Sequence, residues 1–180
     1  MKNTILSLIT VAGLAAVSAA AQAQSYNPFQ IGASGGIAFP TSDLGNTTNT
    51  GYNIAVSVGV KPLMMPIGIR GEAAWNQFGF KNGPNGSINI PSFTGNLTYG
   101  LPLGVGFSPY IIGGIGLYRP SADINGTSSQ ATNEFGWNAG GGLKLPLSTS
   151  FETFVEARYN SVNVNGGTLS FVPLTVGFMF

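Results

Sequence analysis

Eight segments of this chain alternate between apolar side chains and polar or small ones, and this alternation constrains the fold more than any other feature. In the last segment every second residue from Val172 to Phe180 is apolar, whereas the residues between them are mixed. A period of two is typical of a β-strand whose two faces meet different surroundings. The other seven segments are residues 29–39, 52–61, 67–76, 92–101, 105–118, 135–145 and 150–160.

The composition indicates which solvent the apolar face meets. Charged residues make up 7% of the chain, against about 25% in a typical soluble domain. No stretch after residue 24 offers the ~20 consecutive apolar residues of a membrane-spanning helix. A closed barrel is the other fold that satisfies every backbone polar group in lipid. The sequence therefore predicts an all-β fold, an eight-stranded antiparallel up-and-down transmembrane β-barrel.

The alternative is a soluble up-and-down barrel in the periplasm, with its apolar face turned inward around a lipid or another apolar ligand. Its outer surface would then carry glycine, asparagine and serine with few charges. Soluble surfaces normally carry many more charged residues, so the pattern favours the membrane barrel.

The first 23 residues have the pattern of a secretory signal peptide. Lys2 precedes an apolar run from residue 5 to 17, and Ala21-Gln22-Ala23 provides a small-residue cleavage site. The barrel domain is therefore predicted over residues 24–180. A retained helix is the alternative interpretation. The absence of cysteine is consistent with a secreted chain that does not rely on disulfides.

The connections between the predicted strands alternate in length. Three are short, at residues 61–67, 101–106 and 145–150, and four are longer and polar, at residues 40–51, 80–90, 119–133 and 160–168. Outer-membrane barrels have short periplasmic turns and long external loops. Both chain ends are therefore expected on the periplasmic side, and the last strand is expected to close the barrel by pairing with the first.

The predicted lumen contains a charged constellation. By the alternation, four side chains of the third and seventh strands point inward: Arg70, Glu72, Glu156 and Arg158. The interior of an eight-stranded barrel is just wide enough for side chains, so opposite strands can meet across it. Lys61, Lys144 and Glu152 extend this lumen charge network toward the periplasmic mouth.

Three interpretations of this network remain open at the level of sequence. The first is a structural plug, in which charge-assisted pairs fill the lumen. The second is a gate over a narrow ion path. The third is acid–base catalysis by Glu72 and Glu156, which is disfavoured because a carboxylate beside arginine has a lowered pKa and is a poor proton donor.

The chain resembles the small bacterial outer-membrane β-barrel proteins, the relatives of the OmpA membrane domain, OmpX and the opacity proteins. The resemblance rests on the signal peptide and on the segments SPYIIGGIGLYR, WNAGGGLKLPL, FVEARY and VGFMF. It implies a place in the bacterial outer membrane of a Gram-negative-type envelope and insertion by the outer-membrane assembly machinery. Gly177, Phe178 and Phe180 resemble the C-terminal signal that this machinery reads.

Several classes of function are excluded or disfavoured by what the chain lacks. Without histidine or cysteine it has neither the usual catalytic triads nor the usual zinc ligands. The chain has no stripe of basic residues that would favour nucleic-acid binding, and no cofactor is implied.

We therefore expect a protein that is not an enzyme, with a structural or surface-interaction role and a plugged lumen. The alternative is a small-conductance pore. The expected partners are outer-membrane lipids, the assembly machinery and an unidentified extracellular partner, which meets loops 40–51, 80–91 and 119–133.

Overall fold

The computed structural model describes residues 28–62, 65–81, 86–101, 107–124, 127–145, 147 and 151–180. The predicted signal peptide, residues 1–23, lies outside these residues, and so do parts of the three predicted short connections. In the described part of the chain no helix has both the length and the apolar character needed to cross a membrane.

The described residues are almost entirely in β-strands. The strands and the one helix among them are β1 (Phe29–Thr41), α2 (Ser42–Thr47), β2 (Gly51–Val60), β3 (Ile67–Gly79), β4 (Gly86–Gly100), β5 (Ser108–Tyr118), β6 (Ser121–Ile124), β7 (Thr127–Ser128), β8 (Glu134–Leu145), β9 (Glu152–Val164) and β10 (Gly167–Met179).

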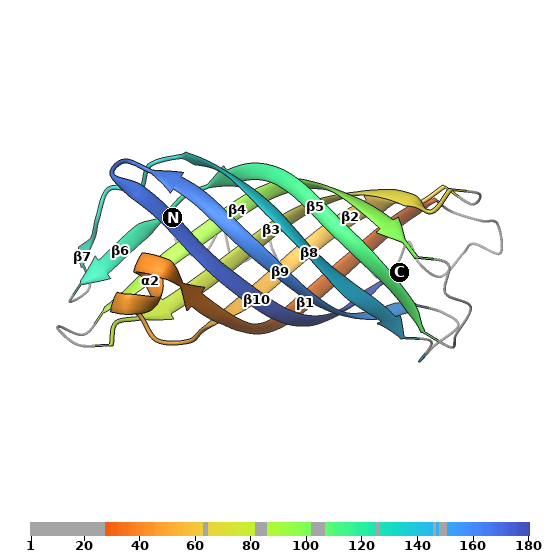
Figure 1. The fold of residues 1–180 in the computed structure, drawn as a ribbon, viewed down its shortest axis with the longest axis horizontal. Coiled ribbons are helices and arrows are strands. Elements are labelled where there is room, and N and C mark those ends of the chain that lie inside the picture. Colours follow the sequence, from red (N-terminus) through yellow and green to blue (C-terminus); the bar gives the residue numbers. More distant parts are fainter. Residues whose placement is uncertain are drawn as a thin grey trace, which may run out of the picture.

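Eight of these strands form a closed antiparallel barrel (Figure 1). The order around it is β3-β2-β1-β10-β9-β8-β5-β4, and β4 returns to β3. The last strand pairs with the first, with Phe178 opposite Ala33 and Leu174 opposite Ile37. The predicted fold and the predicted closure are both confirmed. Because the order is cyclic, β3 and β9 are four strands apart in either direction and face each other across the interior.

The two faces of the barrel differ as the alternation predicts. Along β2, Val56 and Val58 point outward and are 61% and 60% exposed, whereas Asn53 and Ser57 are buried inside. The other barrel strands also turn apolar side chains outward, whereas their inward side chains are polar or small except in the apolar clusters described below. An apolar outer face does not fit the soluble barrel with an apolar interior, so that alternative is overturned.

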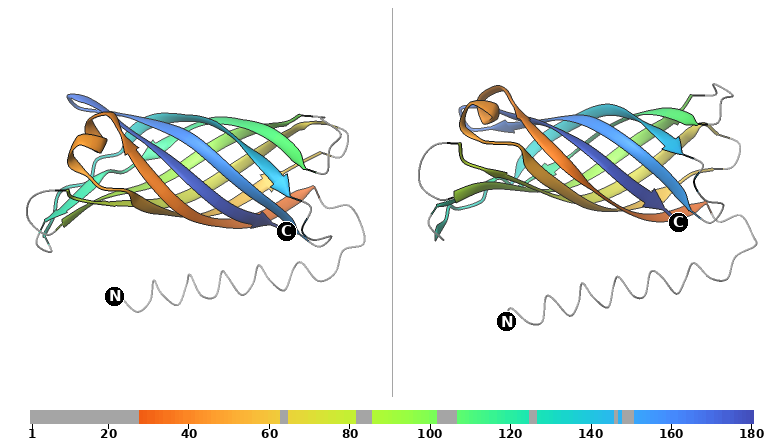
Figure 2. Two further views of the ribbon diagram at one scale, coloured as in Figure 1. Left: turned by 60° about the horizontal axis from the view of Figure 1, so that its bottom comes forward. Right: turned by 90° about the horizontal axis from the view of Figure 1, so that it is seen from below.

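The barrel has two unlike ends. Figure 2 shows α2 beside the hairpin of β9 and β10 at one end, which we call the loop end; β6 and β7 lie at this end too. The opposite end, called the terminal end, holds the first residues of β1 and the last of β10.

The loop end is more ordered than the sequence predicts. The predicted loop 40–51 contains α2, and the predicted loop 119–133 contains β6, which pairs with β4 from Gly86 to Asn89. The predicted long loop 160–168 is wrong, because β9 and β10 continue to a two-residue turn, Asn165-Gly166. Gly166 has a φ of 93°, and the Asn-Gly pair is a strong hairpin signal.

An apolar cluster fills the interior at the loop end. Its buried members are Ala38, Leu44, Phe78, Ile90, Tyr118, Val162 and Phe171. Leu44 projects from α2 and is 1% exposed, so the helix contributes to the closure of the barrel. The rings of Phe78 and Phe171 meet edge to face with centroids 5.5 Å apart. A smaller cluster of Tyr110, Ile112, Phe154 and Met179 lies nearer the terminal end.

Close packing at the seam between β1 and β10 gives a test of the register. A methyl group on Gly36 would collide with the carbonyl oxygen of Leu174, whereas one on the neighbouring, outward-facing Gly35 would come no nearer than 3.6 Å to any atom. Gly36→Ala should lower the free energy of unfolding by about 1–3 kcal/mol because it overpacks the seam. Urea unfolding in lipid vesicles measures the effect, with Gly35→Ala as the matched control. Equal effects of the two variants would contradict the register.

Candidate functional site

Two opposite strands place four charged side chains at the centre of the barrel. Arg70 and Glu72 lie on β3, and Glu156 and Arg158 lie on β9. In each pair the residues are two apart, so both side chains point inward. All four side chains are between 1% and 7% exposed. We call this group the ionic layer.

Ion pairs within the ionic layer cross the barrel. Arg70 Nη2 donates a hydrogen bond to Glu156 Oε2, and Arg158 Nη2 donates one to Glu72 Oε1. Arg158 Nε lies 2.8 Å from Glu156 Oε1, and Arg70 Nε lies 4.0 Å from Glu72 Oε2. Each arginine therefore contacts both carboxylates, and the four charges cancel within one buried group.

The order of residues along the two strands explains this pairing. β3 reads Arg-Gly-Glu and β9 reads Glu-Ala-Arg. Because alternate strands of an antiparallel barrel run in the same direction, β3 and β9 ascend together. The reversed order places each arginine opposite a glutamate, whereas the same order would place like charges opposite each other.

Neighbouring residues hold the ionic layer in place. The Tyr110 hydroxyl donates to Glu156 Oε2 over 2.6 Å, and the Arg70 guanidinium lies 5.5 Å from the ring centroid of Phe154. Glycines on β8 provide the space that these side chains occupy. A Cβ on Gly140 would lie 2.8 Å from Arg158 Cγ, and one on Gly142 would lie 2.6 Å from the Tyr110 hydroxyl.

Buried asparagines lie between the ionic layer and the apolar cluster, and the sequence reasoning did not single them out. Their hydrogen bonds join Asn53 to Asn76 over 2.7 Å, Asn138 to Asn96 over 2.9 Å and Tyr118 to Asn160 over 2.9 Å. Each of these asparagines occupies an inward position of the alternation, and that signal could have identified them.

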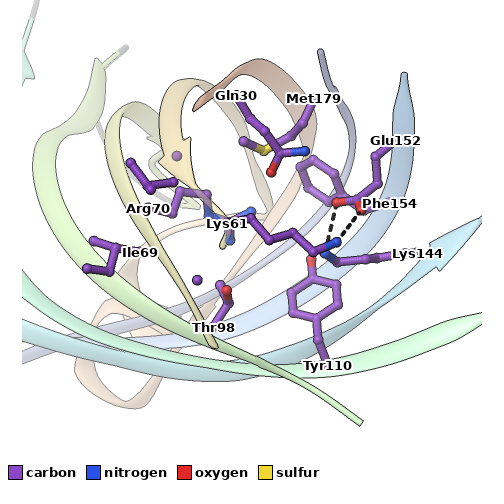
Figure 3. A pocket seen from close by; sticks show the side chains of 13 residues that line it. Gln30, Lys61, Ile69, Arg70, Thr98, Tyr110, Lys144, Glu152, Phe154 and Met179 are labelled. Atoms are coloured by element: carbon purple, nitrogen blue, oxygen red, sulfur yellow. Dashed lines mark hydrogen bonds and ion pairs between the residues drawn. The ribbon is translucent and has the colours of Figure 1, made fainter. Parts of the chain in front are cut away.

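Three further charged residues lie at the terminal end. Glu152 accepts from Lys61 over 3.2 Å and from Lys144 over 2.9 Å. Figure 3 shows both lysine side chains pointing toward this carboxylate, with Tyr110 close by. Lys144 Nζ is 5.4 Å from the ring centroid of Tyr110. We call Lys61, Lys144 and Glu152 the mouth triad. It lies apart from the ionic layer, and no ion pair between the two groups is found among the described residues.

The C-terminal residues proposed as an assembly signal lie on both faces of β10. Gly177 faces inward, where a Cβ would lie 2.5 Å from Phe154 Cζ. Phe178 and Phe180 face outward with ring centroids 5.3 Å apart, and Phe151 packs against both at 6.4 and 5.6 Å. These three rings form an exposed aromatic group at the terminal end.

Among the residues that the structure describes, no group of three or more histidine, cysteine or acidic side chains could hold a metal ion. The buried carboxylates are bound to guanidinium groups. The chemical effect of the ionic layer is that two guanidinium groups and two carboxylates neutralise one another across a narrow interior.

Comparisons with known proteins agree with this architecture. A model of the outer membrane protein β-barrel domain family matches residues 9–180. No curated protein matches the sequence.

Among solved structures, Neisserial surface protein A aligns with a TM-score of 0.69 at 18% identity, over 85% of this chain and 96% of that one. Ail, the attachment invasion locus protein of Yersinia pestis, aligns at 0.51 and 18% identity, over 86% and 100%. A major outer membrane protein from Thermus thermophilus aligns at 0.53 and 10%, over 86% and 99%. At these identities the likeness concerns the fold.

Removal of one arginine tests whether the ionic layer stabilises the barrel. Arg158→Ala leaves Glu72 and Glu156 short of a partner and should lower the free energy of unfolding by about 3–5 kcal/mol. The exposed Arg119→Ala is the control and should change it by no more than about 0.5 kcal/mol. Exchanging the charges, Glu72→Arg with Arg158→Glu, restores a cross-barrel pair and should recover part of the loss. Urea unfolding of the refolded protein measures all three, and an unchanged midpoint for Arg158→Ala would contradict a stabilising role.

Proposed function

Because the chain belongs to the outer membrane protein β-barrel domain family and resides in the bacterial outer membrane, we propose that it is a closed barrel that acts through its external surface. In this proposal the lumen is plugged, and the protein has a structural or surface-interaction role. The observation that carries the proposal is that two different groups of buried side chains, the ionic layer and the apolar cluster, occupy one narrow interior.

The first closure is the ionic layer. Its four side chains contact one another across the lumen and are almost fully buried. An ion that passed this level would have to separate pairs that are shielded from water. Removing one partner of a buried pair costs about 3–5 kcal/mol, so opening the layer in this way is unfavourable.

The second closure is the apolar cluster at the loop end. Leu44 of α2 packs there with Phe78 and Phe171, and none of the three is more than 1% exposed. The helix is held in place by Lys81 Nζ, which donates to the Gly45 carbonyl over 2.5 Å, and by the Thr48 hydroxyl, which donates to the Leu44 carbonyl over 2.7 Å. An apolar constriction adds a barrier to ions that does not depend on the ionic layer.

With the lumen closed, the loop end is the surface that can meet other molecules. In this proposal it faces the outside of the cell, and both chain ends face the periplasm. The segments 40–51, 80–91 and 119–133 carry Lys81 and Arg119 against Asp43 and Asp123, so they have no net charge.

This charge balance bears on the class of external partner. Ail has been crystallised with the heparin analogue sucrose octasulfate. A polyanion of that kind would need a basic surface, which the three segments of this chain do not provide. The external partner that fits them is a neutral, polar surface.

Two further partners belong to the proposal. The outward apolar residues fit the acyl chains of outer-membrane lipids. Gly177, Phe178 and Phe180 resemble the signal read by the assembly machinery, and the exposure of both rings leaves them available to it.

The proposal also holds that the protein is not an enzyme and needs no cofactor. The chain contains no histidine and no cysteine, and Glu72 and Glu156 are neutralised by arginine. Both carboxylates are held in ion pairs across the barrel, so neither is free to act on a substrate.

Electrical recording in planar lipid bilayers tests the proposal of two closures in series. The native protein should show no stepwise conductance. The pair Glu72→Ala and Arg158→Ala removes one ion pair, and the pair Leu44→Ala and Phe171→Ala opens the apolar cluster. Each pair alone should leave the barrel closed, because the other closure remains. The four substitutions together should produce conductance steps.

Each variant must first show the faster migration of a folded barrel when it is loaded unboiled on a gel. Steady conductance of the native protein would overturn the plugged barrel and support the small-conductance pore. Conductance from either pair alone would show that a single closure carries the block.

A further inference from the structure

A small pocket opens beside the mouth triad at the terminal end. It has a volume of about 30 Å³ and reaches inward from Lys61 and Lys144 to Arg70. Gln30 and Thr98 also line it, as Figure 3 shows. Arg70, which belongs to the ionic layer, lines the inner part of the pocket.

The charges that line this pocket do not cancel. Lys61, Arg70 and Lys144 are cationic, and Glu152 is the anionic side chain among the lining residues. The charge of Arg70 is balanced by its hydrogen bond to Glu156 in the ionic layer. Among the remaining lining residues two ammonium groups pair with one carboxylate, so their formal charges sum to one positive charge.

The geometry of the triad shows how an anion would be held. Both lysine Nζ atoms lie within 3.2 Å of the Glu152 carboxylate, Lys61 at Oε2 and Lys144 at Oε1, so both ammonium groups approach the same side chain. The Lys144 side chain is kept in this direction by the face of Tyr110. Each ammonium has three donors, so it can bind a second oxyanion while it stays bonded to the carboxylate.

We propose that this mouth pocket binds a small oxyanion, such as a phosphate group, from the periplasmic side. A volume of about 30 Å³ admits roughly two water-sized groups, which suits two oxygens of a phosphate whose remainder sits at the mouth. Lys61 and Lys144 supply the charge, and the Gln30 amide and Thr98 hydroxyl supply neutral donors. Glu152 competes with the ligand for both lysines. The source of the group is a soluble phosphate or the headgroup of an anionic lipid.

Calorimetric titration of the full-length, refolded protein with inorganic phosphate tests the proposal. In zwitterionic detergent at constant ionic strength, one saturable binding event is expected. Lys144→Met should weaken binding roughly tenfold or more because it removes a charge-assisted hydrogen bond. Lys81→Met, a lysine of the loop end, is the matched control and should leave the affinity unchanged.

Glu152→Gln distinguishes an anion site from a purely structural triad. The substitution keeps the shape of the side chain but removes the competing charge, so phosphate should bind more tightly, by roughly tenfold. Weaker or absent binding to Glu152→Gln, or no saturable binding to the native protein, would overturn the proposal. So would an equal loss of affinity in Lys81→Met and Lys144→Met.

Repeating the titration in lipid nanodiscs identifies the source of the phosphate. If phosphatidylglycerol discs weaken the binding of inorganic phosphate relative to phosphatidylcholine discs, the anionic headgroup occupies the pocket. Equal affinities identify a soluble anion. A closed lumen is not required for either result, because the mouth triad lies at the terminal end, apart from the ionic layer.

Discussion

The narrowness of a closed eight-stranded barrel is the constraint on which the rest of this structure depends. Closure satisfies the backbone of every barrel strand, but it leaves an interior just wide enough for side chains. Side chains on β3 and β9 therefore touch across the lumen, although 86 residues separate their positions in the chain. A wider barrel carrying the same residues would hold the charges apart in water, where ion pairs contribute little.

Within this interior the residues are arranged in layers along the axis. From the terminal end they are the mouth triad, a small aromatic and aliphatic cluster, the ionic layer, the asparagines and the apolar cluster. Hydrogen bonds join side chains within each polar layer, and these bonds lower the cost of burying the groups that make them. Glycines on β8 and β10 offset the bulk of the large inward residues, because Gly140, Gly142 and Gly177 lie against Arg158, Tyr110 and Phe154.

Much of this arrangement is encoded locally, and that part could be predicted. Alternation identified the barrel strands, their faces and the inward direction of Arg70 and Arg158. The inward direction of two arginines and two glutamates on opposite strands predicted that they could pair across the barrel. The reversed order in Arg-Gly-Glu and Glu-Ala-Arg gains its meaning only from the strand directions in the structure. The apolar cluster could not be found in this way, because Phe78, Val162 and Phe171 are apolar residues on the inward face. Alternation assigns apolar residues outward, so at the loop end its signal is lost.

The short elements at the loop end depend on tertiary contacts and not on local pattern. The six residues of α2 are too few for a helix that is stable alone, and Ser42 at its start has a positive φ of 52°. The helix persists because Leu44 is buried in the barrel and because Lys81 of a neighbouring segment binds the Gly45 carbonyl. β6 likewise forms because β4 extends beyond the end of β5 and offers it an unpaired edge. At this end of the barrel, the completed wall is what gives the connecting segments their structure.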